Sequence, residues 1–358
     1  MPRKTIANFE LEYLQIMDET GSVDQELMPK IEKERLKELY KTMLLARTFD
    51  TKLLALQRQG RIGTFPQATG QEAAAIGPAA CLEKDDWYIP SYREFAGLFL
   101  RKMPLSNVIL SFSGDERGNK NNSEYKNYPL TFPIGSQLPQ ATGIAMGMQL
   151  EKKKNVVVVY CGDGATSEGD FHESLNFASV TKAPIIFIVQ NNQYAISTPI
   201  KLQTSSQTFA QKGIAYDIPS IKVDGNDTLA MFAATQEAIQ RAKLHQGPTL
   251  IEAFTYRICD HTSADDAKRY RSEEELESWK KKDPLTRLKI YLEKENIWTD
   301  KDEQQTEKEN EETIAKAIEE ADALPAVTPE DMFQYMYEDM PDNLKEQLED
   351  CKKFKKNE

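Results

Sequence analysis

The chain has 358 residues, 40% of them hydrophobic and 28% charged, and its formal net charge at pH 7 is −12. These values are ordinary for a globular protein with one large core or two modest domains. The acidic balance argues against a nucleic-acid partner, because phosphates would be repelled unless the chain carried a strong basic patch.

Local composition excludes two further classes of protein. The N-terminal residues contain no apolar stretch of the length found in a secretory signal, and no segment approaches the roughly 18 apolar residues of a membrane-spanning helix. The cysteines Cys81, Cys161, Cys259 and Cys351 include no CxxC pair, which favours reduced thiols. We therefore expect a cytoplasmic protein without a membrane partner.

The N-terminal third predicts an arm, a long helix and a helix of small residues. Residues 1–30 are polar and are expected to lie as an arm over another part of the molecule. Glu32 to Leu56 carries apolar residues at helical spacing. A glycine-rich loop begins at Arg58 and changes after Gly70 into a helix of small residues. A short strand is expected just before the turn at Pro90.

A polar loop and a glycine-containing helix follow. Residues 111–133 have few apolar anchors, and a loop of that length needs a purpose. Ile134 to Leu150 is rich in Gly, Ala and Met, and places Gly143 and Gly147 one helical turn apart. Two glycines at this spacing flatten a helix face, so we expect a buried helix–helix contact there, within the chain or between subunits.

The middle of the chain predicts a strand–helix–strand unit. Apolar, β-branched runs begin at Val156 and Ala183 and lack alternation, which is typical of strands buried on both faces. Between them, Asp170 to Val180 shows helical spacing. Parallel strands in such a unit end on the same edge of the sheet. Asp163 and Asn192, 29 positions apart, are therefore expected to be neighbours where open α/β sheets bind ligands.

The C-terminal half predicts two more strands, a helix, a polar loop and a charged helical end. The strands are expected at residues 218–225 and 247–258, and the helix between them at 228–243. The polar loop is expected at 259–272, and the charged helical end from residue 273 onward. The fold class is thus α/β, a doubly wound, mostly parallel sheet with helical N- and C-terminal appendages. We divide the chain into an N-terminal arm and helix (1–45), a core (46–300) and a charged helical tail (301–358).

The two strand exits indicate a magnesium and phosphate site. A lone Gly-Asp-Gly is usually a turn, and no GxGxxG fingerprint starts at Gly162. Together with Asn192 after the next strand, however, it provides the oxygen ligands that Mg²⁺ prefers. Asp163, the Asn192 amide oxygen, a backbone carbonyl and two phosphate oxygens would complete such a site. The flanking glycines let the backbone approach phosphates, and the helix starting near Gly169 directs its positive end towards them.

At these residues the sequence resembles the thiamine-diphosphate enzymes, whose signature is GDG followed after 26 residues by NN. It is most similar to the α subunits of heterotetrameric 2-oxo acid dehydrogenase E1 components, especially those that act on pyruvate. The similarity covers nearly the whole chain. It is carried by RQGRIG…GQEA (58–73), PSYRE (90–94), IGSQLPQATGIAMG (134–147), YCGDGATSEGDFHESLNFA (160–178), QNNQYAISTP (190–199), VDG (223–225), GPTLIEAFTYR (247–257), YRS (270–272) and KKDPLTRL (281–288).

This resemblance implies the thiamine-diphosphate-binding fold and a role for individual residues. Thiamine diphosphate and Mg²⁺ would be the cofactors, with the metal held by Asp163, Asn192 and the carbonyl of Tyr194. The other implied cofactor-binding residues are Tyr92, Arg93, Ile134 (beside the aminopyrimidine), Gly164 and Ala165 (at the diphosphate), Arg257 and His261. The implied substrate-binding residues are Phe65, in the channel by which a 2-oxo acid enters, Tyr92 and Arg93.

His261 is the implied catalytic residue. It matches one member of a cationic pair, with Arg257, on the loop that closes over the cofactor, and an imidazole there could donate a proton near neutral pH. His172 and His245 are interpreted as structural. The loop SGDERGN (113–119) departs from the family pattern, because close relatives often carry a histidine there; Arg117 is left as a possible substitute.

The resemblance also implies that this chain is half of an active site. The glutamate that activates the aminopyrimidine lies on a β subunit in this family, and neither Glu72 nor Glu168 is well placed for that task. The expected partners are an E1 β subunit, in an α₂β₂ heterotetramer, and the dihydrolipoyl acyltransferase E2 with its lipoyl domain. The reaction would decarboxylate pyruvate and transfer the acetyl group to the lipoyl group.

Two other interpretations stay open at the level of sequence. One is the α subunit of an E1 that acts on branched-chain 2-oxo acids or acetoin, because the cofactor motifs are shared. The other is a scaffold or regulatory protein that keeps the fold without the chemistry. The presence of Asp163, Asn192, Arg257 and His261 argues against the second interpretation, since a protein without chemistry has no need of both metal ligands.

Overall fold

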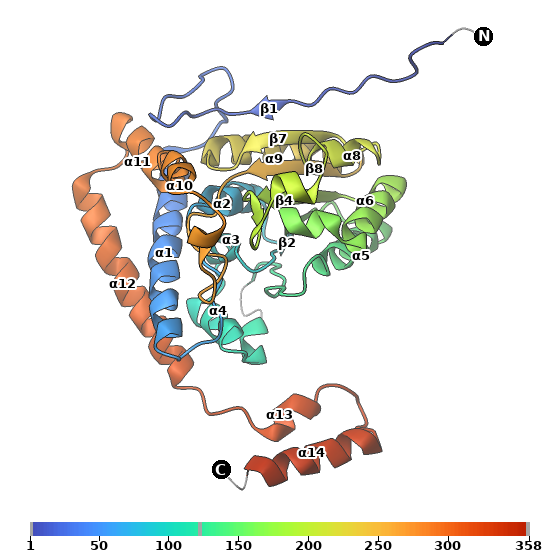
Figure 1. The fold of residues 1–358 in the computed structure, drawn as a ribbon, viewed down its shortest axis with the longest axis vertical. Coiled ribbons are helices and arrows are strands. Elements are labelled where there is room, and N and C mark those ends of the chain that lie inside the picture. Colours follow the sequence, from blue (N-terminus) through green and yellow to red (C-terminus); the bar gives the residue numbers. More distant parts are fainter. Residues whose placement is uncertain (1–2, 121–123, 356–358) are drawn as a thin grey trace.

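The computed structural model describes residues 3–120 and 124–355, and a parallel sheet runs through its centre (Figure 1). Among the described residues the sheet has six strands in the order β1-β7-β8-β4-β3-β2, and every neighbouring pair is parallel. The strands are β1 (Tyr13–Leu14), β2 (Trp87–Ile89), β3 (Val157–Gly162), β4 (Ile185–Asn191), β7 (Ser220–Asp224) and β8 (Thr249–Phe254). A small antiparallel hairpin is formed by β5 (Tyr194–Ala195) and β6 (Thr198–Pro199).

Helices cover both faces of this sheet, which makes the fold the doubly wound α/β type expected from the sequence (Figure 1). Helices α1, α2, α3 and α9 share one core with the sheet, and α5 and α6 share the other. The helices are α1 (Lys33–Arg58), α2 (Glu72–Cys81), α3 (Phe95–Leu100), α4 (Leu105–Phe112), α5 (Gln137–Leu150), α6 (Gly169–Thr181), α7 (Ile200–Gln203), α8 (Gln211–Ile214), α9 (Thr228–Lys243), α10 (Glu273–Lys280), α11 (Pro284–Lys294), α12 (Asp300–Asp322), α13 (Pro329–Phe333) and α14 (Asp342–Lys355).

The central strands are buried on both faces because their side chains alternate between the two cores. Val158 and Tyr160 of β3 belong to the core that contains α1 and α2. Val157 and Val159 belong to the core that contains α5 and α6. This explains why the apolar runs lack the alternation of a strand with one solvated face, and it confirms the predicted strand–helix–strand unit.

Most predicted elements are confirmed, and the differences lie at the edges. The helix predicted from Glu32 is α1, and the helix predicted over 228–243 is α9. The expected irregular loop at 111–133 is shorter, since α4 continues to Phe112 and a 3-10 turn spans Glu116–Asn119; residues 121–123 of that prediction lie outside the described residues. The arm contributes the short strand β1, because pairing with β7 rather than local periodicity fixes its extended backbone.

The division of the chain at residues 45 and 300 stays a prediction. Helix α1 continues through residue 45, and α12 packs along α1 (Figure 1). Helices α13 and α14 pack against each other at the C-terminal end of the described chain. Among the described residues, no helix combines the length and apolarity required to cross a lipid bilayer.

A buried carboxylate fastens the N-terminal segment to the sheet. One oxygen of Asp227 caps α9 by accepting from the backbone N–H groups of Leu229 and Ala230. The other oxygen accepts from the N–H groups of Ile16 and Met17, each at 2.7 Å. Asp227 is fully buried, so all four donors would lose their partner in a dry environment if the carboxylate were removed.

Replacing Asp227 with alanine should therefore lower the free energy of unfolding by about 3–5 kcal/mol, from the lost helix cap and the two unpaired donors of the arm. The measurement is the urea unfolding midpoint, followed by circular dichroism. Asp331→Ala is the matched control, because Asp331 also caps a helix but is exposed. If the two variants lost the same stability, the arm would not depend on Asp227.

Candidate active site

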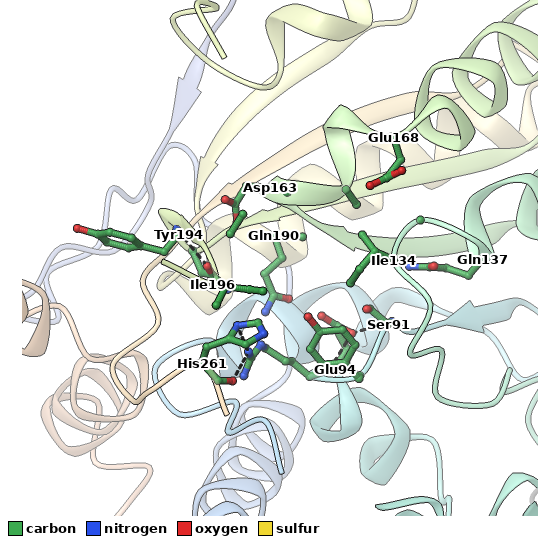
Figure 2. A pocket seen from close by; sticks show the side chains of 18 residues that line it. Ser91, Glu94, Ile134, Gln137, Asp163, Glu168, Gln190, Tyr194, Ile196 and His261 are labelled. Atoms are coloured by element: carbon green, nitrogen blue, oxygen red, sulfur yellow. Dashed lines mark hydrogen bonds between the residues drawn. The ribbon is translucent and has the colours of Figure 1, made fainter. Parts of the chain in front are cut away.

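A cavity of about 260 Å³ opens at the carboxyl edge of the sheet (Figure 2). Its walls come from the segments that follow β2, β3 and β4, from the start of α5 and from the loop after β8. The residues that line it are Ser91, Tyr92, Arg93, Glu94, Ile134, Gly135, Gln137, Gly162, Asp163, Gly164, Ala165, Glu168, Gln190, Asn192, Tyr194, Ala195, Ile196 and His261. The cavity thus unites most of the residues singled out from the sequence.

The exit of β3 supplies a buried carboxylate flanked by two glycines. Asp163 is 2% exposed, and burial raises the pKa of its carboxyl group above the ordinary value. One of its oxygens accepts a 2.7 Å hydrogen bond from the side-chain amide of Gln203 in α7. A Cβ at Gly164 would lie 2.8 Å from the Cβ of Ala195, whereas a Cβ at Gly162 would meet nothing within 4 Å. Glycine at 164 is therefore required by packing, and glycine at 162 keeps the cavity wall open.

The exit of β4 lies beside it and supplies amide oxygens. Gly162 and Gln190 are partners in the parallel register of β3 and β4, which places Asp163 and Asn192 together as predicted. The Asn192 amide nitrogen donates to the Gln71 side-chain oxygen at 3.0 Å, and its oxygen accepts only a long bond, 3.4 Å, from the backbone of Tyr194. The side-chain oxygen of Gln190 is buried without a hydrogen-bond partner.

Tyr194 contributes its backbone rather than its ring. The ring points away from the cavity, and its hydroxyl donates to Glu275 at 2.8 Å (Figure 2). The carbonyl oxygen accepts a 3.2 Å bond from Arg257. Arg257 itself is 1% exposed and also donates to the carbonyl of Ile196 and to the hydroxyl of Tyr270. Arg257 thus lies behind the cavity wall, where it contacts lining residues without lining the cavity itself.

His261 lies between two guanidinium groups, and the expectation that it acts with Arg257 over the cofactor stays a prediction. Its ring nitrogen Nδ1 lies 3.1 Å from the guanidinium of Arg93 and 3.2 Å from that of Arg257. Burial, first of all, and then these two cations lower the pKa of His261 to about 3. With two guanidinium donors at Nδ1, that nitrogen acts as the acceptor and the proton belongs on Nε2.

Arg93 joins two walls of the cavity. Its guanidinium donates to the carbonyl of His261 at 2.7 Å and to the carbonyl of Gln67. Tyr92, its neighbour, lies under the same guanidinium, with 5.3 Å between the charge and the ring centroid. Among the described residues, none of the hydrogen bonds of Arg93 or Arg257 goes to a carboxylate. Both buried cations therefore lack a directly bonded carboxylate among the described residues, and the nearby Asp265 is linked to Arg257 through the hydroxyl of Tyr270.

The remaining predicted residues fall in different places. Ala165 is buried and lines the cavity, and Ile134 lines it while staying 48% exposed. Phe65 is fully buried against Phe95 and Phe112 and is absent from the cavity wall. Its place in a substrate channel stays a prediction.

Sequence reasoning missed several polar residues of the cavity. Glu94 is 3% exposed, accepts from the backbone N–H groups of Ser91 and Arg93, and has its pKa raised by burial to about 7. Gln137 donates to the carbonyl of Tyr160, which leaves its own side-chain oxygen buried and unpaired. Glu94 and Gln137 stand inside motifs that carry the family resemblance, and that was the one signal available for them.

Three residues considered from the sequence do not place a functional group inside the cavity. Glu72 is engaged by Arg47 at 2.5 Å and by the N–H of Gly70, away from the cavity wall. Glu168 is exposed at the rim (Figure 2). Arg117 pairs with Asp115 at 2.5 Å and lies outside the cavity wall.

The donor set fits a magnesium ion that arrives with a diphosphate. Among the described residues, no three His, Cys, Asp or Glu side chains are close enough to share an ion. Asp163, Asn192 and the carbonyl of Tyr194 nevertheless offer three oxygens to one cavity, and Mg²⁺ commonly binds few protein groups together with phosphate oxygens. The unpaired cations Arg93 and Arg257 and the unpaired amide oxygens suit a ligand with both anionic and N–H groups.

Comparisons with known proteins identify the family of the chain. Residues 40–330 match the family described as dehydrogenase E1 component. The pyruvate dehydrogenase E1 component subunit alpha of Acholeplasma laidlawii is 44% identical over 340 residues, which cover 94% of this chain and 99% of that protein. The proteins of the same name from Bacillus subtilis (strain 168) and Staphylococcus aureus (strain Mu50 / ATCC 700699) are each 42% identical, over 94% of this chain and 91% and 92% of their own lengths. The chain belongs to the dehydrogenase E1 component family.

The environment of His261 predicts its protonation state. The chain has three histidines, so the His261 signals can be assigned in a histidine-labelled sample by their loss in His261→Gln. By nuclear magnetic resonance the ligand-free imidazole should stay neutral from pH 8 down to pH 5, with the proton on Nε2, because the folded-state pKa is near 3. The unfolded chain takes up this proton near pH 6.5, so the histidine's contribution to stability is present above that pH and is lost as the pH falls. Protonation above pH 6 would contradict this assignment.

Proposed function

We propose that the chain is the α subunit of the E1 component of a pyruvate dehydrogenase complex. With a β subunit it would decarboxylate pyruvate and transfer the acetyl group to the lipoyl group of E2. The observation that carries the proposal is the adjacency of Asp163 and Asn192 at two parallel strand exits, in a chain that belongs to the dehydrogenase E1 component family. The names of its relatives supply the substrate.

The metal and cofactor would occupy the cavity in a way that uses the groups described above. Asp163, Asn192 and the carbonyl of Tyr194 would hold Mg²⁺. Gly164 and Ala165 would offer backbone groups to the diphosphate, and Ile134 would lie beside the aminopyrimidine. Thiamine diphosphate, when bound, supplies the electron sink that decarboxylation of a 2-oxo acid requires.

The cations and the histidine would prepare the cavity for that chemistry. Arg93 and Arg257 would balance the negative charge of the diphosphate that Mg²⁺ does not neutralise. Tyr92 would lie with Arg93 on the substrate side. His261 holds a proton on Nε2 while Nδ1 accepts from both guanidinium groups. It could exchange that proton with a substrate oxygen, which is the role of a general acid–base. We infer that His261 serves acyl transfer more than cofactor binding.

A β partner is supported by what the cavity lacks. Glu72 and Glu168 are respectively ion-paired outside it and exposed at its rim. Ile134 and Ile196 line the cavity and are 48% and 55% exposed, so the mouth opens to the surface beside apolar side chains. Gly143 and Gly147 of α5 face open space in this chain, so the expected close contact is not made within it. These features support an α₂β₂ assembly in which the partner completes the cavity.

A second candidate function is the α subunit of an E1 for branched-chain 2-oxo acids or acetoin. Cofactor contacts would be shared, and the difference would lie in the space near Tyr92. Turnover of pyruvate, 3-methyl-2-oxobutanoate and acetoin by the complete α₂β₂ enzyme decides between them. A preference for pyruvate is expected. The cytoplasmic location inferred from the sequence stays a prediction.

Asp163→Ala should abolish Mg²⁺-dependent binding of thiamine diphosphate while the chain still folds. The change removes the carboxylate among the three proposed ligands and leaves the flanking glycines intact. Isothermal titration calorimetry measures the binding, and circular dichroism checks the fold. Asp170→Ala is the matched control, since Asp170 begins α6 outside the cavity wall. Unchanged affinity in Asp163→Ala would refute the metal assignment.

The purified chain should be inactive alone and gain activity on mixing with a β subunit, as an α₂β₂ heterotetramer. The physical reason is the missing carboxylate that must contact the cofactor's aminopyrimidine. The assay is decarboxylation of pyruvate with an artificial electron acceptor, run on a sample shown to be free of partners by mass spectrometry. A full rate from the chain by itself would overturn the proposal of a shared active site.

A further inference from the structure

One buried side-chain oxygen serves two amides at the site. The Oε1 atom of Gln71 accepts from the Asn192 amide at 3.0 Å and from the Gln190 amide at 2.8 Å. All three residues are buried, with exposures of 1%, 6% and 2% for Gln71, Asn192 and Gln190. Solvent therefore offers no easy alternative partner to these amide groups.

This arrangement fixes which end of each amide faces the cavity. An amide that directs its nitrogen at Gln71 must turn its oxygen the other way. Among the described residues, the Asn192 oxygen is then left with the 3.4 Å bond from Tyr194, and the Gln190 oxygen has no hydrogen-bond partner. Both residues line the cavity, and since the Gln190 oxygen is itself buried, the acceptor left for a ligand is that of Asn192.

The three amides are coupled, because reversing one forces the others to follow. If Gln71 turned its nitrogen inward, three NH₂ groups would meet without an acceptor. Asn192 and Gln190 would then have to reverse as well, and Asn192 would direct a nitrogen where the proposed metal needs an oxygen. The orientation of Gln71 thus determines whether Asn192 can act as a ligand.

The backbone that carries Gln71 is itself held in place. Gly70 has φ of +92°, and a Cβ there would lie 2.4 Å from Ile258, so the turn requires glycine. The Gly70 carbonyl accepts a 3.1 Å bond from Thr255, which follows β8. The Gln71 N–H donates to the carbonyl of Ala68. A fixed turn therefore sets where the Gln71 side chain begins, and the Gln71 amide nitrogen is buried without a hydrogen-bond partner among the described residues.

We propose that Gln71 is a positioning residue for the metal site: its side-chain oxygen accepts from the Asn192 and Gln190 amides, so that Asn192 turns its oxygen towards the proposed metal. This inference rests on the proposed function, because it takes Asn192 as a magnesium ligand. It predicts that the site needs a hydrogen-bond acceptor at position 71, of whatever charge, and that an apolar group of the same size is insufficient.

The test compares Gln71→Leu with Gln71→Glu in the full chain. Mg²⁺ is titrated by calorimetry in the presence of saturating thiamine diphosphate, and bound Mn²⁺ is followed separately by electron paramagnetic resonance. Gln71→Leu should weaken metal affinity by about 10–100-fold, the usual effect of removing a group that orients a ligand. Gln71→Glu keeps an acceptor and should stay within about threefold of the unmodified chain or bind more tightly. Gln305→Leu, on the exposed side of α12, is the matched control and should change nothing.

Each outcome distinguishes this role from simple packing. Equal loss of affinity in the Leu and Glu variants, or unchanged affinity in Gln71→Leu, would overturn the inference while leaving the proposed function intact. Should Gln71→Leu fail to fold, Gln71→Met fills a similar volume without an acceptor and is judged by the same criterion. Absence of metal binding in the unmodified chain would overturn the proposed function, and this inference with it.

Discussion

The parallel pairing of β3 with β4 is the constraint on which the site depends. Their register matches Gly162 with Gln190, so Asp163 follows at the level of Asn191 and lies one position from the level of Asn192. A shift by one residue would exchange every side chain of a strand between the two cores. Since both cores are filled by these strands, the register is fixed from both sides, and the adjacency of Asp163 and Asn192 follows from it.

The cavity has two buried guanidinium groups beside it whose hydrogen-bond acceptors carry no negative charge. Arg93 and Arg257 approach the same imidazole, and burial together with the nearby Arg93 lowers the pKa of Arg257. Their hydrogen bonds go to carbonyl, hydroxyl and imidazole acceptors, which carry no full negative charge. Two like charges held this way cost stability in the empty protein. An anion in the cavity would offset that cost, which is why a diphosphate suits the site better than a neutral metabolite.

The sequence predicted those parts of the fold and site that local pattern controls. Unbroken β-branched runs identified β3 and β4, and parallel topology then predicted that Asp163 lies beside Asn192. The side chains that hold the site could not be found this way. Gln71 and Gln190 are separated by 119 residues, and no periodicity or spacing relates them. The pKa of His261 is likewise lowered by burial and by Arg93, 168 residues away in the chain, and no local pattern could have indicated that contact.

The carboxyl group of Glu94 does line the cavity, and its contacts bear on the proposed partner. Glu94 is buried, but one oxygen is bound to the N–H groups of Ser91 and Arg93 and so fixes the turn that presents Arg93. Moving Glu94 towards a cofactor would release that turn. It would thereby also release the Arg93 guanidinium, which donates to the carbonyl of His261. A carboxyl group with this structural role is not free to move during proton transfer. In the proposed function the chain would provide the metal ligands, the phosphate surroundings and the histidine, and the mobile carboxylate would come from a partner surface over the exposed Ile134 and Ile196.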